Sequence, residues 1–392
     1  MRRFTQDWQS GHLRNMLSNI RRRRGWFLEN ASPRQLANLA LAGTQFALKH
    51  ETMRAWPVLV KVDISPACNL GCTFCVHARP GNTVDDRLRG QSFRGRTMSV
   101  GQFADLVDQL RGRSMAVSLY YLGDPLVHPQ LDEICGVSRA AGLNTHISSN
   151  FSFRLSDERL CGLLTSGLTH LTVCVDSLRQ ERYELTRVGG RIDLVLDNLE
   201  RLMQLRRQLG QKQPNVEVQF IKFQHNRDEL EHAARWCRDR GIDQFTDYWG
   251  NLHNYADVAP GRYQVFGPKP RKVLPRCSWP HFSLQVKYNG DVIPCCYYRQ
   301  SEQYREGGDS RIVGNVFDSG LWAVWNSSAY RQLRRLVSNP TRVEDDPALG
   351  ATFCHGCPTV FETDAAAHEY VADSHTWAEL YTLDSSGRVQ RK

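Results

Sequence analysis

The chain has 392 residues, of which 41% are hydrophobic and 23% are charged, a balance typical of a soluble globular protein. This length accommodates two domains, or one large domain with an extension. The 12 cysteines are too few for a secreted disulfide scaffold of this size, and the first ten residues lack the apolar core of a signal peptide, so we expect reduced thiols in a cytoplasmic protein.

The net charge of +9 is concentrated near the N-terminus. Residues 1–56 contain ten Lys/Arg and three Asp/Glu, a balance of +7, which leaves +2 for the remaining 336 residues. We therefore expect no basic groove across the whole protein, and no aromatic residues alternate with these charges as in a nucleic-acid-binding face. The run Arg21–Arg24 predicts a solvated helix end, or contact with anionic lipid at a membrane, an acidic substrate or an acidic electron donor.

Residues 1–56 are expected to form a basic helical extension, whose second helix covers 34–49. From Pro57 onward, β-branched runs alternate with amphipathic patterns. Strands are expected over 58–64, 116–122, 143–148, 169–176, 215–223 and 242–248, and helices over 99–112, 129–141, 156–166, 190–210 and 227–240. This repeat predicts an α/β fold, a partial (β/α)6 TIM-like barrel over 57–250, with ligands at the carboxyl ends of its strands.

A second, smaller unit is expected after the barrel. Residues 251–276 have the Pro-Gly content of a linker, and 277–358 then form a small domain of a β-hairpin and helices. Asn-Gly at 289–290 lies between two alternating runs, which is a strong hairpin signal, and 321–337 has a helical pattern. Residues 359–392 are a polar C-terminal tail.

The first strand leads into a loop that holds Cys68, Cys72 and Cys75 in the spacing C-x3-C-x2-C. Thiolates this close in sequence indicate one shared metal centre. A structural zinc site needs four ligands and the loop offers three, while a bacterial ferredoxin run has another spacing and a fourth thiolate. Three thiolates on a four-iron cluster leave one iron open to a small chelator, such as the amino and carboxylate groups of S-adenosylmethionine (SAM). Structural zinc is the alternative interpretation.

The loop resembles the signature of the radical SAM superfamily, which has this spacing with an aromatic residue, here Phe74, before the last cysteine. The resemblance implies a [4Fe–4S] cluster that reductively cleaves SAM to methionine and a 5′-deoxyadenosyl radical. That radical abstracts hydrogen from an unactivated C–H bond of the substrate. The resemblance also implies a low-potential electron donor such as flavodoxin or ferredoxin.

Further residues match the SAM-binding positions of this family. These are Phe74 beside the adenine, Gly123-Asp124-Pro125 at the amino group, Ser149 and Asn150 near the ribose, and Arg187 at the carboxylate. A guanidinium suits a carboxylate because it can form two parallel hydrogen bonds. Without the resemblance, Gly-Asp-Pro would be an ordinary turn and Arg187 a surface charge at a helix end.

The fourth strand alternates strictly, which directs Thr172, Cys174 and Asp176 into the barrel. The family usually has a serine near the ribose where this chain has Cys174. A thiol at this position can fill space, or it can donate a hydrogen atom to a substrate radical. Asp176 is expected near SAM, and Glu217 and Gln219 on the next strand are candidate substrate contacts.

A second set of cysteines follows in the small domain: Cys277, Cys295, Cys354 and Cys357. Their spacing alone fits zinc or a second iron–sulfur cluster. The stretch resembles the SPASM/twitch domains of the same superfamily at Gly290, Asp291, Pro294, Cys295, Cys296, Gly314-Asn315-Val316, Trp325-Asn326-Ser327 and the closing CxxC. The resemblance implies one auxiliary [4Fe–4S] cluster on these four cysteines, because the two-cluster version needs more than the five present here.

The resemblance implies an oxidoreductase or epimerase that acts on a hydroxyl-bearing carbon of a sugar- or aminocyclitol-like small molecule. A peptide- or protein-modifying maturase is one alternative, although such enzymes often carry two auxiliary clusters and a leader-binding module. A lipid-modifying enzyme is another, suggested by the basic N-terminal residues. A non-catalytic iron–sulfur electron-transfer or sensor protein would have no use for Gly123-Asp124-Pro125 and Arg187.

Overall fold

The computed structural model describes most of the chain. The described residues are 24–72, 75, 77, 93, 95–223, 225–247, 277–295, 312–340, 342–343, 345–355 and 360, with the backbone alone at 248–249, 341, 381–383 and 389–391. Phe74, Cys296, Cys357, the arginines at 21–23 and the predicted linker 251–276 lie outside this set.

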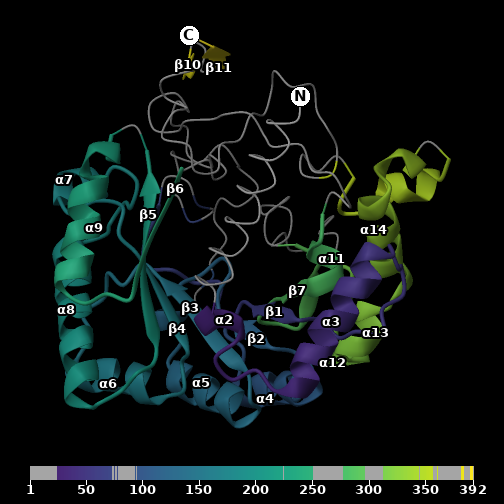
Figure 1. Cartoon of the computed structure of the whole chain (residues 1–392), viewed down its shortest axis with the longest axis horizontal. Helices are drawn as coiled ribbons and strands as arrows, with labels where there is room; N and C mark the ends of the chain where they lie inside the picture. The colour runs from purple at the N-terminus through teal and green to yellow at the C-terminus, as the bar shows by residue number, and fades with distance from the viewer. Residues whose placement is uncertain are drawn as a thin grey trace, which may run out of the picture.

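One sheet of nine strands, in the order β6-β5-β4-β3-β2-β1-β7-β8-β9, runs through the described structure (Figure 1). Its six parallel barrel strands are β1 (Leu59–Val62), β2 (Ala116–Ser118), β3 (Asn144–Ser149), β4 (His170–Cys174), β5 (Asn215–Lys222) and β6 (Gln244–Trp249). This arrangement confirms the predicted α/β fold with a partial parallel barrel.

The C-terminal hairpin continues the same sheet. Strand β7 (Ser283–Val286) pairs in parallel with β1, so that Val60 lies between Val117 of β2 and Leu284 of β7. Strands β8 (Asp291–Ile293) and β9 (Gly314–Asn315) follow in antiparallel register. The predicted hairpin is therefore confirmed, while the exact domain boundaries stay predictions.

Helices cover the outer face of the parallel strands, where Val60, Val117 and Leu171 are fully buried (Figure 1). The helices are α4 (Val100–Leu110), α5 (Leu131–Ala140), α6 (Asp157–Thr165), α8 (Ile192–Gln208) and α9 (Leu230–Asp239). Ser99 and Ser156 cap the first turns of α4 and α6, which satisfies backbone N–H groups that have no partner within the helix.

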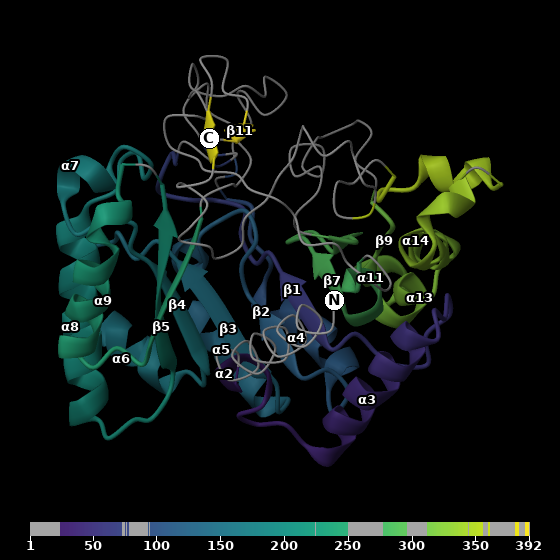
Figure 2. The same ribbon diagram turned by 45° about the horizontal axis from the view of Figure 1, so that its top comes forward.

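Part of the predicted N-terminal extension packs on the barrel. Helix α2 (Arg24–Phe27) lies at the amino ends of β3 to β5, where the ring of Trp26 stacks on His146 with 3.8 Å between ring centroids. A Cβ atom added to Gly25 would lie 3.1 Å from Nδ1 of His170, so the backbone approaches the strand closely. Helix α3 (Pro33–Ala47) then packs against α11 at the side of the sheet (Figure 2).

Four helices surround the C-terminal hairpin: α11 (Trp279–Phe282), α12 (Val316–Ser319), α13 (Leu321–Trp325) and α14 (Ser328–Ser338). The helix expected over 321–337 is interrupted at Asn326, because its side-chain amide binds both backbone groups of Met53, at 2.9 and 3.1 Å. Ser327 then begins α14 by accepting a hydrogen bond from the Tyr330 N–H.

The remaining described elements are short: the turns η2 (Pro125–Val127), α7 (Gln180–Tyr183), η3 (Arg227–Glu229), η5 (Pro340–Val343) and η6 (Pro347–Ala351), and the two-stranded sheet β10 (Tyr381–Leu383) with β11 (Val389–Arg391). Among the described residues, no helix combines the length and the apolar character that a bilayer crossing requires. Within the same residues, no two cysteines form a disulfide.

Candidate active site

The predicted cysteine loop lies at the carboxyl end of β1. Cys72 is buried, and Cys68 and Cys75 are half-buried. The loop is held from two sides: the N–H of Gly71 donates to the carbonyl of Val188 at 3.0 Å, and the N–H of Cys75 donates to the carbonyl of Cys72 at 3.0 Å. The thiols therefore lie where the strand ends of a barrel place its chemistry.

The Gly123-Asp124-Pro125 turn packs directly against this loop. A Cβ atom on Gly123 would lie 2.1 Å from the carbonyl oxygen of Ser65 and 2.4 Å from that of Ala67. The N–H of Asp124 donates to the Ala67 carbonyl at 2.9 Å. Only glycine fits at position 123, because the backbone of the cysteine loop occupies the space of any side chain.

The carboxylate of Asp124 joins the ends of β2 and β3. It accepts hydrogen bonds from Ser149 Oγ at 3.0 Å, from the Asn150 N–H at 2.8 Å and Nδ2 at 2.7 Å, and from the Leu126 N–H at 3.0 Å. Burial raises the pKa of Asp124 to about 6 although these donors favour its ionised form. The structure thus brings Asp124, after β2, together with Ser149 and Asn150 at the end of β3. The sequence placed these residues on separate strands.

Asn150 also reaches the cysteine loop. Its Nδ2 lies 2.9 Å from Asn69 Oδ1 and 3.8 Å from Cys68 Sγ. Asn69 in turn donates from Nδ2 to the carbonyl of Ser152 at 2.8 Å. The end of β3 is therefore bonded to the loop as well as to the turn after β2.

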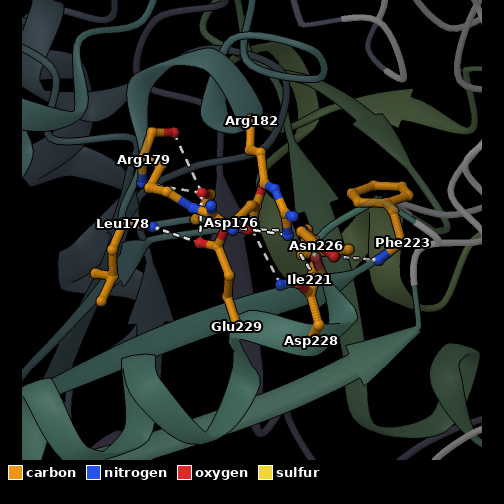
Figure 3. A network of polar contacts seen from close by, with 10 residues as sticks. Asp176, Leu178, Arg179, Arg182, Ile221, Phe223, Asn226, Asp228 and Glu229 are labelled. Atoms are coloured by element: carbon orange, nitrogen blue, oxygen red, sulfur yellow. Dashed lines mark hydrogen bonds and ion pairs between the residues drawn. The ribbon is translucent and has the colours of Figure 1, made fainter.

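Arg187 is buried and does not lie on the surface. Its Nε donates to Oδ2 of Asp176 at 2.6 Å, and its positive charge partly offsets the rise that burial causes in the pKa of Cys72. Asp176 is held in turn by the Ile221 N–H at 3.0 Å on Oδ1 and by Asn226 Nδ2 at 2.6 Å on its carbonyl (Figure 3). The guanidinium is therefore fixed beside the cysteine loop.

A second carboxylate holds the loop that follows β4. Glu229 accepts hydrogen bonds from Ser177 Oγ at 2.7 Å, from the Leu178 N–H at 3.1 Å and from Arg179 Nε at 2.8 Å (Figure 3). The sequence does not single out Asn226 or Glu229, since both belong to an ordinary polar segment between strands.

Cys174 points into the barrel, as strand alternation predicts. Its Sγ lies 3.9 Å from Oε1 of Gln219 on β5 and 4.0 Å from Oγ of Ser148 on β3. Burial raises the pKa of the thiol, so it keeps its proton at neutral pH.

Cys174, Gln219 and Ser148 form one layer of side chains inside the barrel. Farther from the cysteine loop, side chains of the strands fill the inner face of the barrel. Glu217 accepts from Thr246 Oγ1 at 2.5 Å and pairs with His170 Nε2 at 2.8 Å. His146 Nε2 lies 3.0 Å from Thr172 Oγ1. Glu217, a candidate substrate contact from sequence, is engaged inside this network, whereas Gln219 lies one layer nearer the cysteine loop.

Three cysteines of the second set lie in the small unit among the described residues. Cys277 precedes α11, Cys295 follows β8 and Cys354 follows η6. The side chain of Tyr330 is fully buried near two of them: burial raises its pKa, and the charges of Cys354 and Cys295 raise it further. Among the described residues its hydroxyl has no hydrogen-bond partner.

Arg334 lies next to Tyr330. It is fully buried and donates to the carbonyls of Pro280 at 2.8 Å, Glu51 at 2.9 Å and Trp325 at 2.7 Å. Its guanidinium carbon lies 4.2 Å from the ring centroid of Trp325 and 5.0 Å from that of Tyr330. Burial lowers its pKa to about 9.

The residues present fit the iron–sulfur clusters that both cysteine sets imply. Burial raises the pKa of Cys68 well above its usual range and that of Cys72 to about 12, so a bound metal is what would hold them as thiolates. Among the described residues, no three His, Cys, Asp or Glu side chains converge as around a single metal ion, and a four-iron cluster is larger, with its thiolate ligands on separate iron atoms. The hydroxyl of Tyr330 and the cation of Arg334 suit a cluster of net negative charge.

Sequence reasoning missed several residues that build this site. His77 places Nε2 3.1 Å from the carbonyl of Leu122 and so ties the end of the cysteine loop to the segment that follows β2. Tyr183 is fully buried close enough to Cys72 for the two to interact electrostatically. Proximity to the cysteines in sequence could have indicated Asn69 and His77, but nothing marks Tyr183 or Tyr330.

Comparisons with known proteins agree with this geometry. Residues 62–237 match the family model of the radical SAM superfamily, and 277–358 match the SPASM model, an iron–sulfur cluster-binding domain. These matches confirm the family predicted from the cysteine spacings and its cofactors, a [4Fe–4S] cluster with SAM and an auxiliary iron–sulfur cluster. The individual ligands and SAM contacts stay predictions.

Curated relatives include GTP 3′,8-cyclases. That of Stenotrophomonas maltophilia strain R551-3 is 29% identical over 188 residues, which are 48% of this chain and 53% of the relative. That of Chlorobaculum tepidum is 26% identical over 145 residues, 37% and 40% of the two chains. The chain thus spans about half the length of the curated relatives it matches.

Solved structures with a similar fold include Streptococcus suis SuiB bound to S-adenosylmethionine, with a TM-score of 0.57 at 14% identity over 92% of this chain and 87% of SuiB. SuiB bound to the precursor peptide SuiA gives 0.56 at 14% identity, over 86% and 80%. A histidine-tagged form of anSMEcpe with bound AdoMet gives 0.50 at 12% identity, over 80% and 90%. At these identities the likeness concerns the fold alone.

Proposed function

Because the chain belongs to the radical SAM superfamily and carries a C-terminal SPASM iron–sulfur domain, we propose that it dehydrogenates a hydroxyl-bearing carbon of a small, carbohydrate-like substrate. Epimerisation of the same carbon is the second outcome open to the same substrate radical. The observation that carries the proposal is the polar inner face of the barrel around Cys174, next to the cysteine loop.

In this proposal Cys68, Cys72 and Cys75 hold the cluster that binds SAM, and Cys277, Cys295, Cys354 and Cys357 hold the auxiliary cluster. When bound, the first supplies the electron that cleaves SAM to methionine and a 5′-deoxyadenosyl radical, and the second supplies an electron acceptor. The chain itself contributes binding, orientation and exclusion of water. A low-potential flavodoxin or ferredoxin would serve as the external electron donor.

SAM would be held by the residues that converge on the cysteine loop. Arg187 would bind the carboxylate of SAM, and the contact of its Nε with Asp176, which fixes the direction of the guanidinium, supports this role. The oxygens of Asp124 are already occupied by Ser149, Asn150 and Leu126, so we assign the SAM amino group to backbone carbonyls of the Gly123–Pro125 turn. Asp124 then acts by positioning this turn.

The substrate would lie over the polar layer formed by Ser148, Cys174 and Gln219. Lys61 and Tyr120 belong to the same inner face, with the Lys61 amine 4.5 Å from the Tyr120 ring centroid. Hydroxyl, thiol and amide groups at this depth can each exchange hydrogen bonds with a hydroxyl-rich molecule, whereas an apolar chain would leave them unsatisfied.

The reaction balances as a two-electron oxidation. One hydrogen atom leaves the carbon of a C–OH group and becomes part of 5′-deoxyadenosine. The remaining carbon radical loses one electron and its hydroxyl loses one proton, which leaves a C=O group. Epimerisation would instead return one hydrogen atom to the opposite face of the same carbon from a thiol such as Cys174, and the resulting thiyl radical would then take up one electron and one proton.

A peptide-modifying function is the second candidate. SuiB, which shares the fold over most of the chain, is recorded in complex with a precursor peptide, but this likeness concerns architecture and not substrate. The curated relatives, by contrast, are named for an activity on GTP, a small hydroxyl-bearing molecule. The matched sequence and the polar barrel layer therefore both favour a small substrate.

The test is an anaerobic assay of the reconstituted enzyme with SAM and reduced flavodoxin or dithionite. Candidate sugars, aminocyclitols, nucleotides and peptides are supplied with deuterium on carbon, and mass spectrometry follows the label into 5′-deoxyadenosine. We expect deuterium transfer from a hydroxyl-bearing carbon and a product two mass units lighter than unlabelled substrate. Transfer from a labelled peptide alone would overturn the proposal in favour of a maturase.

A further inference from the structure

Helix α3 turns two glutamines toward the protein beside Leu39, Ala42 and Phe46, and exposes several of its other apolar residues. A surface helix normally turns its polar residues outward and its apolar ones inward. Its buried residues are Gln35, Ala42 and Gln45, while Leu36 and Leu41 are 44% and 40% exposed. The helix is fifteen residues long, so its exposed apolar face extends over about four turns.

The buried polar side chains explain why the helix holds this orientation. Gln35 Nε2 donates to the carbonyl of Ser114 at 2.7 Å, and Asn38 exchanges two hydrogen bonds with the backbone of Trp56, at 3.0 and 2.8 Å. Gln45 Oε1 accepts from the N–H groups of residues 54 and 55, at 3.0 and 2.9 Å. These bonds satisfy backbone groups of neighbouring segments, so the helix cannot rotate without leaving them unpaired.

The outward face is consequently apolar and almost without charge. Its exposed residues are Pro33, Arg34, Leu36, Ala37, Ala40, Leu41, Thr44, Ala47 and, at the C-terminal cap, Leu48, which is 65% exposed. We call this set the α3 face. Between Gln35 and Leu48 the chain has no Asp, Glu, Lys or Arg. A contiguous apolar stripe of this kind is typical of an interaction site.

Basic residues lie at both ends of the α3 face. Arg34 stands at its first turn, and Lys49 and Arg54, both exposed, follow its last turn. The preceding residues 1–23 add six arginines against one aspartate. At the flank, Trp322 is 37% exposed and packs on Trp56, with 4.7 Å between ring centroids. Leucine beside tryptophan, bordered by cations, is the composition of a segment that lies in a membrane interface.

We propose that the α3 face docks on the surface of an anionic membrane, with its leucines in the interfacial region and the basic residues on lipid headgroups. Charge decides between this occupant and a second copy of the chain. Two copies that met through the α3 face would bring together two segments of balance +7, whereas an anionic lipid surface neutralises them. The proposal is independent of the proposed function.

The test is sedimentation of the holoenzyme with lipid vesicles under anaerobic conditions. Vesicles of phosphatidylcholine mixed with phosphatidylglycerol are compared with vesicles of phosphatidylcholine alone. The test variant is Leu36→Glu with Leu48→Glu, at positions exposed enough to accept a charge without unfolding. The control is Leu209→Glu, because Leu209 is 45% exposed at the end of α8, outside the α3 face. Iron content and circular dichroism verify that each variant is folded.

We expect the wild type and Leu209→Glu to sediment with the anionic vesicles, less so at high salt, and only weakly with neutral ones. The double variant should partition at least about tenfold more weakly, since two carboxylates would have to enter the interface. The proposal is overturned if the wild type does not sediment with anionic vesicles. It is also overturned if the double variant binds them as tightly as the wild type does, which would assign binding to residues 1–23 alone. A wild-type dimer that the double variant converts to a monomer, with no vesicle binding, would assign the α3 face to self-association.

Discussion

Arg187 and Asp176 form a buried ion pair, with Arg187 Nε 2.6 Å from Asp176 Oδ2, at the point where the cysteine loop meets the end of β4. A buried carboxylate in contact with a guanidinium fixes both the position and the direction of that guanidinium. The pair is itself held by the N–H of Ile221 on β5 and by the side chain of Asn226. This rigidity is what a carboxylate clamp for a small ligand requires.

Replacing Arg187 should weaken SAM binding. Arg187→Ala removes a charge-assisted contact, at a cost of about 1.5–3 kcal/mol, or roughly 10- to 150-fold in Kd. The SAM affinity of Arg187→Lys should lie between those of the wild type and Arg187→Ala, because an ammonium keeps the charge but cannot form the bidentate contact. Anaerobic equilibrium dialysis with labelled SAM measures the three affinities.

Arg191→Ala is the control for this comparison. Arg191 lies four residues further on and pairs with Asp193 on the surface. Its loss should leave SAM affinity within about twofold, since exposed pairs contribute little. Equal affinities of wild type and Arg187→Ala would show that the clamp lies at another residue.

Iron content tests the two cluster assignments. Reconstituted protein should hold two four-iron clusters, roughly eight irons per chain. Changing Cys68, Cys72 and Cys75 to alanine should remove about half of the iron, and changing Cys354 and Cys357 the other half. Cys135→Ala, a buried thiol on α5, should remove none. Stoichiometric zinc in place of the second half would contradict the auxiliary cluster.

Tyr330 offers a test of the auxiliary site that needs no turnover. Its buried hydroxyl lacks a partner among the described residues and lies near Cys295 and Cys354. We expect it to donate a hydrogen bond to the bound cluster, which favours the reduced, more negative state. Tyr330→Phe should therefore lower the midpoint potential, measured by EPR-monitored titration of protein that carries only the auxiliary cluster.

The matched control is Tyr183→Phe in the same background. Tyr183 is equally buried and its hydroxyl also lacks a partner in the described structure, but it lies near Cys72. The auxiliary potential should not change in that variant. If Tyr330→Phe and Tyr183→Phe have the same midpoint potential, the Tyr330 hydroxyl does not donate a hydrogen bond to the auxiliary cluster.

The strands, the cysteine loop and the inward direction of Cys174 could be predicted because each depends on local pattern. Alternation along one strand decides which side chains face the barrel, and three cysteines within eight residues must lie near one another. The convergence of Asp124 with Ser149 and Asn150 could not be predicted in this way. It depends on how two strands, more than twenty residues apart, are placed side by side.

Helix α3 shows a different limit of sequence reasoning. The spacing of its apolar residues along the sequence predicts a helix, and the helix is present. The same spacing does not indicate which apolar residues face solvent: Leu39 packs against the core while Leu36 and Leu41 are exposed, because buried glutamines satisfy backbone groups of other segments. Likewise, nothing in the composition of the N-terminal extension indicates that Trp26 stacks on His146 at the end of the barrel.

Acid should weaken the contact between α3 and the small unit through His281. This side chain is buried, lies 3.2 Å from the carbonyl of His50 and is near the Arg334 cation. Burial, and to a lesser extent Arg334, lowers its pKa from 6.5 to about 4. Between these values the unfolded chain binds more protons than the folded one, so stability is fully present above pH 6.5 and falls as the pH falls.

The expected loss is about 1 kcal/mol between about pH 7.5 and about pH 6. Unfolding by urea at the two pH values measures it. His281→Gln keeps a donor toward His50 but cannot titrate, so the pH-dependent difference should shrink by about that amount. An identical pH dependence in His281→Gln and the wild type would contradict the assignment.

Cys174 decides between the two outcomes of the proposed reaction. Its Sγ faces Gln219 and Ser148 inside the barrel, and burial keeps the thiol protonated, which is the form that can give up a hydrogen atom. A thiol exchanges its hydrogen with water, so an epimerase run in deuterium oxide would place one solvent deuterium on the inverted carbon. A dehydrogenase would form a ketone without that thiol.

We expect the ketone, and Cys174→Ala should therefore keep at least part of the activity. Cys174 stands next to the residues proposed to bind SAM, where the family has a serine near the ribose, and a donor for inversion must instead reach the face of the substrate opposite to the deoxyadenosyl group. Cys135→Ala, which removes a buried thiol on the outer layer, controls for general effects of losing a cysteine. Nuclear magnetic resonance of the product, made in deuterium oxide by both variants, distinguishes the cases. Deuterium in an inverted product, present with Cys135→Ala and lost with Cys174→Ala, would make Cys174 the hydrogen donor and the protein an epimerase.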